Sequence, residues 1–597
     1  MHSGSGARRQ ESGTARVIVV DFARRDRHNA GVTGDETSHA QVTWTEVDGV
    51  AVVHVDDDGP LRASLVFRIG KTDEYLHANG ITHLVEHLAL YALGQPPHYQ
   101  NGSVRTCITT FDTMGDDEQV IAFLRGTCEA LTHLDATRLE AERRVLEVEA
   151  RQRGTGLSSE LYTWRYGASG PGLWGLDEYA VRGTSAEAVQ AWADHVFRAE
   201  NAVLLMSGPP PAGLSLPLRH GARLPVPALE PVLPETPAQF TTGRPAVGGM
   251  AAITRSVAAS SYSELLKKRL VDRLRRDLAV SYSPEVEYDR YDATTAHLIV
   301  VADIHPDHLT PAASALVQVV DEMATAPVDA AELAAHKNER RTMLGLLDPM
   351  SKAASEALSW LLTGESTPWD AYEDEFEGLT ADDLLEPARQ TRDGMLYAVP
   401  AGAELDDADI PQAPRSSLAP ELGGKDLVRS TAAPAGSRLK VSDEGVERWW
   451  ADGTRATVRY STCRALLAYP SGQRVLIAPD ATVVAVEPAE WVGGKALVTD
   501  IDARASHVLV PMTEMLPTPT EPARTSVPSR TSWIARLALG ILSAVGGLVM
   551  LIAATDPAEK DKSGMFVFAG AWMWFGAWLI RGAWQDRGRE RAARAST

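Results

Sequence analysis

Cysteine is nearly absent from this chain, and its scarcity excludes two kinds of site. The 597 residues include only Cys107, Cys128 and Cys463, which are too few and too scattered for a disulfide framework or a cysteine-based metal site. An excess of positive charge is also missing, because 58 lysines and arginines stand against 79 aspartates and glutamates, for a formal net charge of -21. So acidic a chain is a poor general binder of nucleic acid, and we expect no nucleic-acid partner.

The start of the chain lacks the long apolar run of a secretory signal, whereas its end is apolar. Residues 1–42 are polar apart from the short run 17–20, so we expect a flexible tail. Two uncharged runs, 537–554 and 564–580, are each at the short end of a bilayer span. Arginines before the first run and after the second predict that both termini stay in the cytoplasm. We therefore expect a cell-membrane protein with two transmembrane helices and a large cytoplasmic part; a buried helical hairpin of a soluble domain is the alternative.

In place of cysteine ligands, the chain carries the pentapeptide His83-Leu84-Val85-Glu86-His87. This H-x-x-E-H pattern is the signature of inverted zinc peptidases. On a helix, His83 and His87 project from one face, and their spacing lets two imidazoles bind one metal ion. Glu86 lies on the same side and can reach a water at the metal. Two histidines in an apolar helix can also be ordinary core, so a third ligand decides between the two interpretations.

A charge-rich helix predicted over residues 137–153 offers carboxylates for that third position. Helical periodicity alone does not choose among them, and runs of charge are usually solvated faces. The candidates are Glu140, Glu142, Glu147 and Glu149.

The order of predicted strands and helices divides the chain into parts. Two stretches of mixed α and β pattern, 43–207 and 238–402, have elements in a similar order, which indicates an internal duplication. A segment rich in proline and glycine separates them, and from residue 436 short alternating runs with Asp-Gly and Ser-Gly turns predict a small antiparallel β module. The expected divisions are a tail (1–42), a first lobe (43–207), a linker (208–237), a second lobe (238–402), a linker (403–435), the β module (436–512), a linker (513–532), the hairpin (533–584) and a basic tail (585–597).

The motif GITHLVEHL followed by the helix ERRVLEVEA resembles the insulinase/pitrilysin family of zinc peptidases. Members of that family follow H-x-x-E-H with a helix of the form E-R-x-V-[LI]-x-x-E, whose second glutamate binds zinc and whose first supports the site. The resemblance implies Zn2+ bound by His83, His87 and Glu149, with Glu142 as the supporting carboxylate. It also implies an α+β fold of two similar α/β-sandwich lobes of the insulinase type, of which the first is catalytic.

Two further segments resemble the parts of this family that bind substrate. Asn101-Gly102-Ser103, with the strand TCITTF, is similar to the edge strand that pairs with the substrate backbone. Leu274–Tyr282 is similar to the family segment L-R-x-x-x-G-x-x-Y, which implies that Arg275 and Tyr282 contact substrate near the scissile bond. This chain lacks the glycine of that segment, and the 61 residues between His87 and Glu149 are fewer than is usual in the family.

The resemblance implies a membrane-anchored zinc endopeptidase that acts on peptides or small unfolded polypeptides, with Glu86 as the general base. The family's reaction chamber needs two such two-lobed units, so we expect a homodimer or a heterodimer with a related chain. Inert family members serve as partner subunits, and a catalytically inert scaffold is therefore the alternative. The β module resembles a pleckstrin-homology-like fold, but no specific residue supports a lipid-sensing adaptor.

Overall fold

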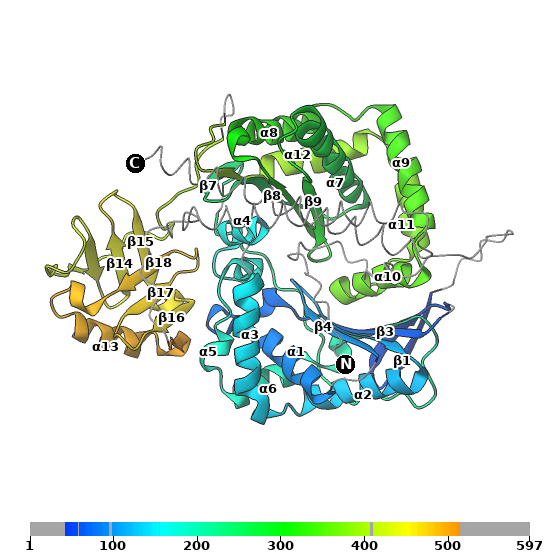
Figure 1. Ribbon diagram of the computed structural model, residues 1–597, viewed down its shortest axis with the longest axis horizontal. Helices are drawn as coiled ribbons and strands as arrows, with labels where there is room; N and C mark the ends of the chain where they lie inside the picture. The colour runs from blue at the N-terminus through cyan, green and yellow to red at the C-terminus, as the bar shows by residue number, and fades with distance from the viewer. Residues whose placement is uncertain are drawn as a thin grey trace, which may run out of the picture. The chain divides into compact units, whose positions relative to one another are not determined.

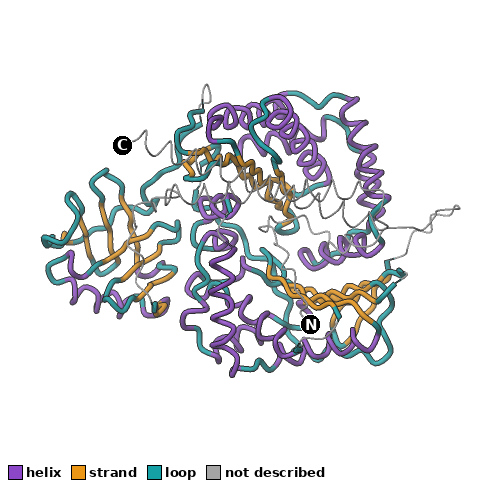
Figure 2. The backbone as a smooth tube through the Cα atoms, in the orientation of Figure 1, coloured by secondary structure: helices purple, strands orange, loops and turns teal. Residues whose placement is uncertain are grey.

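The computed structural model describes residues 42–513, apart from 58, 95–97, 154–155, 234 and 406–409. This part contains two lobes of mixed α and β structure followed by a β module (Figures 1 and 2). Within it, none of the helices combines the length and the apolar character that crossing a bilayer requires. The expected N-terminal tail, the two apolar runs and the basic C-terminal tail lie outside the described residues.

The first lobe combines a six-stranded sheet with α-helices. The strand order is β1-β2-β6-β3-β5-β4, in which β2 and β6 are parallel and the other neighbours are antiparallel. The strands are β1 (Thr43–Val47), β2 (Val50–His54), β3 (Leu61–Phe67), β4 (Tyr99–Val104), β5 (Thr109–Gly115) and β6 (Ala202–Met206). The helices are α1 (Ile81–Ala92), α2 (Asp117–Thr132), α3 (Leu139–Arg153), α4 (Leu157–Tyr166), α5 (Ala180–Gly183) and α6 (Ala186–Val196).

Both faces of this sheet are buried, which explains why its central strands are almost wholly apolar. In β2, Val52 packs in the core shared with α1, α2 and α6, and the next residue, Val53, faces the opposite side. β6 (AVLLM) is buried at every position. A strand covered on both faces has no need of alternating polar residues, and β-branched valines suit such a pleated surface.

The second lobe repeats the topology of the first. Its strand order, β7-β11-β8-β10-β9, matches β2-β6-β3-β5-β4, and β7 pairs with β11 in parallel as β2 does with β6. The strands are β7 (Ala238–Thr242), β8 (Ala246–Thr254), β9 (Glu285–Arg290), β10 (Thr295–Asp303) and β11 (Leu396–Pro400). The helices are α7 (Val257–Leu270), followed by a π-helical segment (Val271–Asp277), α8 (Leu309–Thr325), α9 (Ala330–Gly345), α10 (Pro349–Thr363), α11 (Trp369–Gly378) and α12 (Leu385–Gly394).

The two lobes exchange one helix each. Leu157 and Leu161 of α4 pack in a core with strands of the second lobe, whereas Leu358 and Leu361 of α10 pack against the first sheet. Each helix therefore covers a face of the other lobe's sheet, and burial of apolar surface joins the lobes.

The β module consists of two four-stranded sheets and one helix, α13 (Gly494–Arg504). It begins at Lys425, within the range expected to be a linker, and β19 runs parallel to β16, whereas the other neighbouring strands of the module are antiparallel. The first sheet has the order β12 (Lys425–Asp426), β13 (Arg438–Val441), β14 (Gly445–Trp449), β15 (Arg455–Arg459). The second has the order β18 (Val483–Val486), β17 (Arg474–Ile477), β16 (Ala465–Ala468), β19 (Leu509–Pro511).

Candidate metal centre

The start of α1 is fixed by a buried carboxylate. Glu74 accepts hydrogen bonds from the backbone N–H groups of Gly80 (2.7 Å) and Thr82 (2.9 Å), so a negative charge satisfies free donors at the helix N-terminus. Gly80 adopts φ 91, and an added Cβ there would lie 2.7 Å from Glu178 Cβ. The left-handed backbone and the close neighbour both favour glycine, and together they set the position of His83 one turn later.

Two helices bring the three expected ligands together. α1 and α3 lie side by side (Figure 1), and Glu149 Oε2 is 3.7 Å from His83 Nε2 and 3.5 Å from His87 Nε2. One ligand atom from each of these residues lies within 4.8 Å of the others. Two ligands about 2.1 Å from a tetrahedral zinc are about 3.4 Å apart. The spacing therefore suits a single metal ion, and these residues could hold one.

A second carboxylate supports each histidine from the opposite side of its ring. His83 Nδ1 is 3.1 Å from Glu178 Oε2, and His87 Nδ1 is 3.4 Å from Glu142 Oε2. When a carboxylate accepts the Nδ1 proton, the lone pair on Nε2 is free for a metal and the ring orientation is fixed. Both Nε2 atoms face Glu149. The structure thus places the Glu142 carboxylate beside His87.

Cations lie beside these supporting carboxylates and beside Glu74. Lys71 Nζ is 2.8 Å from Glu178 and 3.6 Å from Glu74, and Arg138 Nη2 is 3.1 Å from Glu142. Burial opposes the charge of Glu178, but attraction to Lys71 and the hydrogen bond with His83 hold the pKa of that carboxyl well below its usual range. Because Lys71 is only 2% exposed, it acts in a setting where a charge–charge attraction is weakly screened.

The ligand group itself carries an excess of negative charge. Burial alone would lower the pKa of His87, but the nearby Glu149, Glu86 and Glu142 carboxylates outweigh it and raise that pKa above its ordinary value. The same carboxylates that favour a proton on this imidazole favour a divalent cation in its place.

Glu86 lies beside the ligands, under the edge strand of the sheet. It is 6% exposed, and its Oε2 is 3.9 Å from His83 Nε2. A Cβ added to Gly102 of β4 would lie 2.5 Å from Glu86 Oε1 and 2.8 Å from Leu90 Cδ1. Glycine is therefore required at position 102 because a side chain would displace the carboxylate. The sequence placed Gly102 at the substrate edge, and the structure adds this contact.

β4 stands at the edge of the first sheet. Among the described strands it pairs with β5 alone, with Asn101 opposite Asp112 and Gly102 opposite Phe111. Asn101 is exposed. An edge of this kind offers backbone groups to which an extended peptide can add as a further strand.

Arg275 and Tyr282 lie in the second lobe and are not among the three grouped ligands. Arg275 is exposed in the π-helical segment, and its guanidinium carbon lies 5.1 Å from the centre of the Tyr282 ring. Tyr282 is 82% exposed. Ala279 occupies the position where the resembling segment has glycine, and it has φ 54, a left-handed conformation that glycine adopts without strain.

Sequence reasoning missed Glu178 and Lys71. Glu178 lies in the irregular segment before α5, far from the histidines in sequence, and no periodicity marks it. Lys71 lies in a short turn after β3. One physical argument could have predicted such a residue. A metal-binding histidine needs a partner on its second nitrogen, and Glu142 can serve only one of the two histidines.

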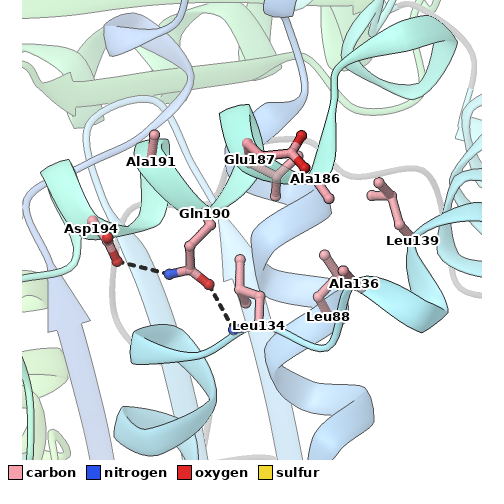
Figure 3. A pocket seen from close by; sticks show the side chains of 10 residues that line it. Leu88, Leu134, Ala136, Leu139, Ala186, Glu187, Gln190, Ala191 and Asp194 are labelled. Atoms are coloured by element: carbon pink, nitrogen blue, oxygen red, sulfur yellow. Dashed lines mark hydrogen bonds between the residues drawn. The ribbon is translucent and has the colours of Figure 1, made fainter.

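A separate cavity of about 440 Å3 is lined by residues of α1, α6 and the start of α3 (Figure 3). It contains no histidine, and within it Gln190 donates to Asp194 (2.7 Å) and accepts from the Leu134 N–H (2.8 Å). This hollow is therefore distinct from the metal centre. It is lined by Leu88, Leu134, Ala136, Leu139, Ala186, Glu187, Val189, Gln190, Ala191 and Asp194.

Comparisons with known proteins identify the fold. No protein-family model and no curated protein matches the sequence. Among solved structures, a protease from Helicobacter pylori is covered over 99% of its length by 60% of this chain, with TM-score 0.51 and 15% identity. A peptidase M16 inactive domain from Pseudomonas fluorescens is also similar: 62% of this chain covers 100% of that domain, with TM-score 0.49 and 15% identity. The first half of the periplasmic protease PqqL from Escherichia coli is similar as well: 61% of this chain covers 92% of it, with TM-score 0.46 and 13% identity.

The likeness to the Helicobacter pylori protease, together with the repeated sheet topology, confirms the expected fold class of two similar α/β lobes. At such low identity this likeness shows the fold alone. Because one fold serves many functions, the activity has to be argued from the site.

Proposed function

We propose that this protein is a zinc endopeptidase that hydrolyses peptides or small unfolded polypeptides. The observation that carries the proposal is the convergence of His83 Nε2, His87 Nε2 and Glu149 Oε2 from two helices. Two imidazole nitrogens and one carboxylate oxygen are a ligand set that suits Zn2+ and leaves its fourth position open, as catalytic zinc sites do. Each histidine also has the carboxylate partner that such ligands require.

When bound, zinc supplies a Lewis acid that activates water and polarises the scissile carbonyl. The chain's own residues supply the proton transfers and the positioning. Glu86 is the only carboxylate of H-x-x-E-H, and it lies near the ligand atoms without joining the grouped three. It therefore acts as the base that takes the proton of the attacking water and then delivers it to the leaving amine.

The substrate backbone adds to the free edge of β4, where Asn101 and Gly102 face the incoming strand. Because Gly102 lies directly over Glu86, a peptide on this edge passes beside the base. Arg275 and Tyr282 offer an exposed cation and an exposed phenol on the second lobe, and we assign them to contact the substrate near the scissile bond, where their hydrogen bonds stabilise developing negative charge.

Zinc content and cleavage of a quenched fluorescent peptide, measured on the full chain, test this proposal. We expect about one zinc per chain and zinc-dependent cleavage, with Glu86→Gln keeping its zinc and losing about 100-fold or more in rate, as removal of a general base does. Cleavage that survives in Glu86→Gln would refute the assignment of the base. Zinc bound without cleavage of any peptide would instead favour the inert scaffold.

We further propose that residues 537–554 and 564–580 anchor the chain in the cell membrane, with the lobes and both termini in the cytoplasm. Their length, lack of charge and flanking arginines support this. The described residues contain one pair of lobes, so we also propose that a homodimer, or a heterodimer with a related chain, closes the reaction chamber. Alkaline extraction of membranes tests the membrane anchor, and light scattering of the detergent-solubilised protein tests the dimer.

A further inference from the structure

The second sheet of the β module is apolar on both faces. Along β16, Leu466 lies in the module's own core, whereas Ala465 and Leu467 face the first lobe; along β17, Leu476 faces inward. Alternate residues of a strand point to opposite faces, so this sheet has one face for the module and one for its neighbour. The outward face forms a cluster with the first lobe, which we call the docking cluster; it contains Leu76, Ala168, Leu173, Tyr179, Ala465, Leu467, Tyr469, Val475, Ile477 and Val510.

Backbone contacts fix the position of the module on this face. The N–H of Ala168 donates to Pro479 O (2.8 Å). Gly167 adopts φ 64, and a Cβ there would collide with the same carbonyl oxygen. A Cβ on Gly183 of α5 would lie 2.6 Å from Pro511 of β19. The two parts thus meet at van der Waals distance along a buried surface, as packed cores do.

The docking cluster lies on the segments that support the metal centre. Tyr179 directly follows Glu178, the partner of His83, and Leu76 follows Glu74, which binds the N-terminus of α1. Beyond Tyr179, Arg182 of α5 reaches Glu147 of α3 at 3.1 Å.

The segment with Glu178 has little regular structure of its own. It consists of an extended loop and α5, a helix of four residues. The Asn79 side chain donates to Leu176 O and Asp177 O, and the Ala180 N–H donates to Asn79 O. An irregular segment of this kind also depends for its order on what packs against it. The module packs against it: Tyr179, which is 6% exposed, lies in the docking cluster with residues of β16 and β17.

We propose that the β module is a positioning domain for the metal centre: docked, it holds residues 176–183 so that Glu178 orients His83, and loosening it weakens metal binding. This inference rests on the proposed zinc site and adds a means of regulating it. The residues that act are Leu467, Val475 and Ile477, through Tyr179; none of them contacts the ligands.

Neighbouring leucines of β16 provide a matched pair of variants in the full chain. Leu467→Ala removes buried side-chain atoms from the docking cluster, and Leu466→Ala removes the same atoms from the module's own core. Zinc affinity is measured by competition with a chelator, and exchange of backbone amides in residues 176–183 by mass spectrometry. We expect about a tenfold loss of zinc affinity and faster exchange only in Leu467→Ala, since losing a ligand's hydrogen-bonded partner costs about 10- to 100-fold. Leu467→Met, which conserves volume, should restore both.

The outcomes separate this inference from the proposed function. If the unmodified protein binds no zinc, the proposed function fails, and amide exchange still decides whether the module orders residues 176–183. If it binds zinc and cleaves peptide but the two leucine variants behave alike, the inference is overturned and the proposed function stands. Should Leu467→Ala not fold, Val475→Ala in the docking cluster and Val484→Ala in the module core form a second matched pair.

Discussion

The residues that hydrogen-bond to the candidate ligands are as important to the candidate metal centre as the ligands themselves. The spacing of the pentapeptide on a helix suggested His83, Glu86 and His87, but two histidines in an apolar helix can also be ordinary core. Glu149 required the longer family pattern, since four glutamates share its helix. Glu178 had no local signal: its role arises from a fold that returns an irregular segment to the first histidine.

Lys71 tests the importance of charge in this arrangement. Lys71→Met leaves Glu74 and Glu178 buried without their cation, so we expect a loss of about 3–5 kcal/mol in the free energy of unfolding, as for other broken buried ion pairs. Urea unfolding measures it. Lys267→Met, which breaks a half-exposed pair with Glu285, is the control and should cost less than about 1 kcal/mol. Equal losses would show that Lys71 has no special role.

Gly102 tests the contact between the edge strand and the base. In Gly102→Ala the new Cβ meets Glu86 Oε1 and Leu90, so the carboxylate must move. A misplacement of about 1 Å costs about 100-fold in rate, while zinc content should not change. Gly243→Ala is the matched control because a Cβ there meets nothing within 4 Å. Unaltered peptide cleavage in Gly102→Ala would contradict the assigned position of the base.

At the scale of elements, the order of strands and helices was predictable but the partners of the helices were not. The similar order in residues 43–207 and 238–402 indicated a duplication, and the two sheets have the same topology. Periodicity tells which face of a helix is buried, not which sheet covers it. The exchange of α4 and α10 between lobes was therefore not visible in the sequence.

The first sheet of the β module predicts sensitivity to acid. Glu447 of β14 is fully buried; burial opposes its charge, but hydrogen bonds from the Leu422 N–H and from three side chains lower the pKa of Glu447 from 4.5 to about 2. The folded state thus binds this proton less readily than the unfolded state. Its contribution to stability is present above about pH 4.5 and is lost as the pH falls toward 2.

Chemical unfolding between pH 6 and pH 3 checks this expectation. Glu447→Gln should be less stable than the unmodified protein at pH 6, and the difference should shrink as the pH falls. A difference that stays constant over this range would show that Glu447 is not the titrating group.

For the whole molecule, the sequence predicted two lobes and a β module but not how they support one another. The run ALLA of β16 and residues 475–477 of β17 are apolar at consecutive positions, which indicates strands covered on both faces. They do not reveal that the cover is the segment carrying Glu178. The role of the module in holding this segment is, like the membrane anchor and the dimer, a proposal about the full chain.

Zinc K-edge X-ray absorption of the zinc-loaded full chain measures whether His83, His87 and Glu149 bind one ion together. We expect two imidazole ligands and additional oxygen ligands at about 2.0–2.2 Å, with one oxygen lost or replaced in Glu149→Ala. A spectrum without imidazole scattering, or one that Glu149→Ala leaves unchanged, would contradict this expectation.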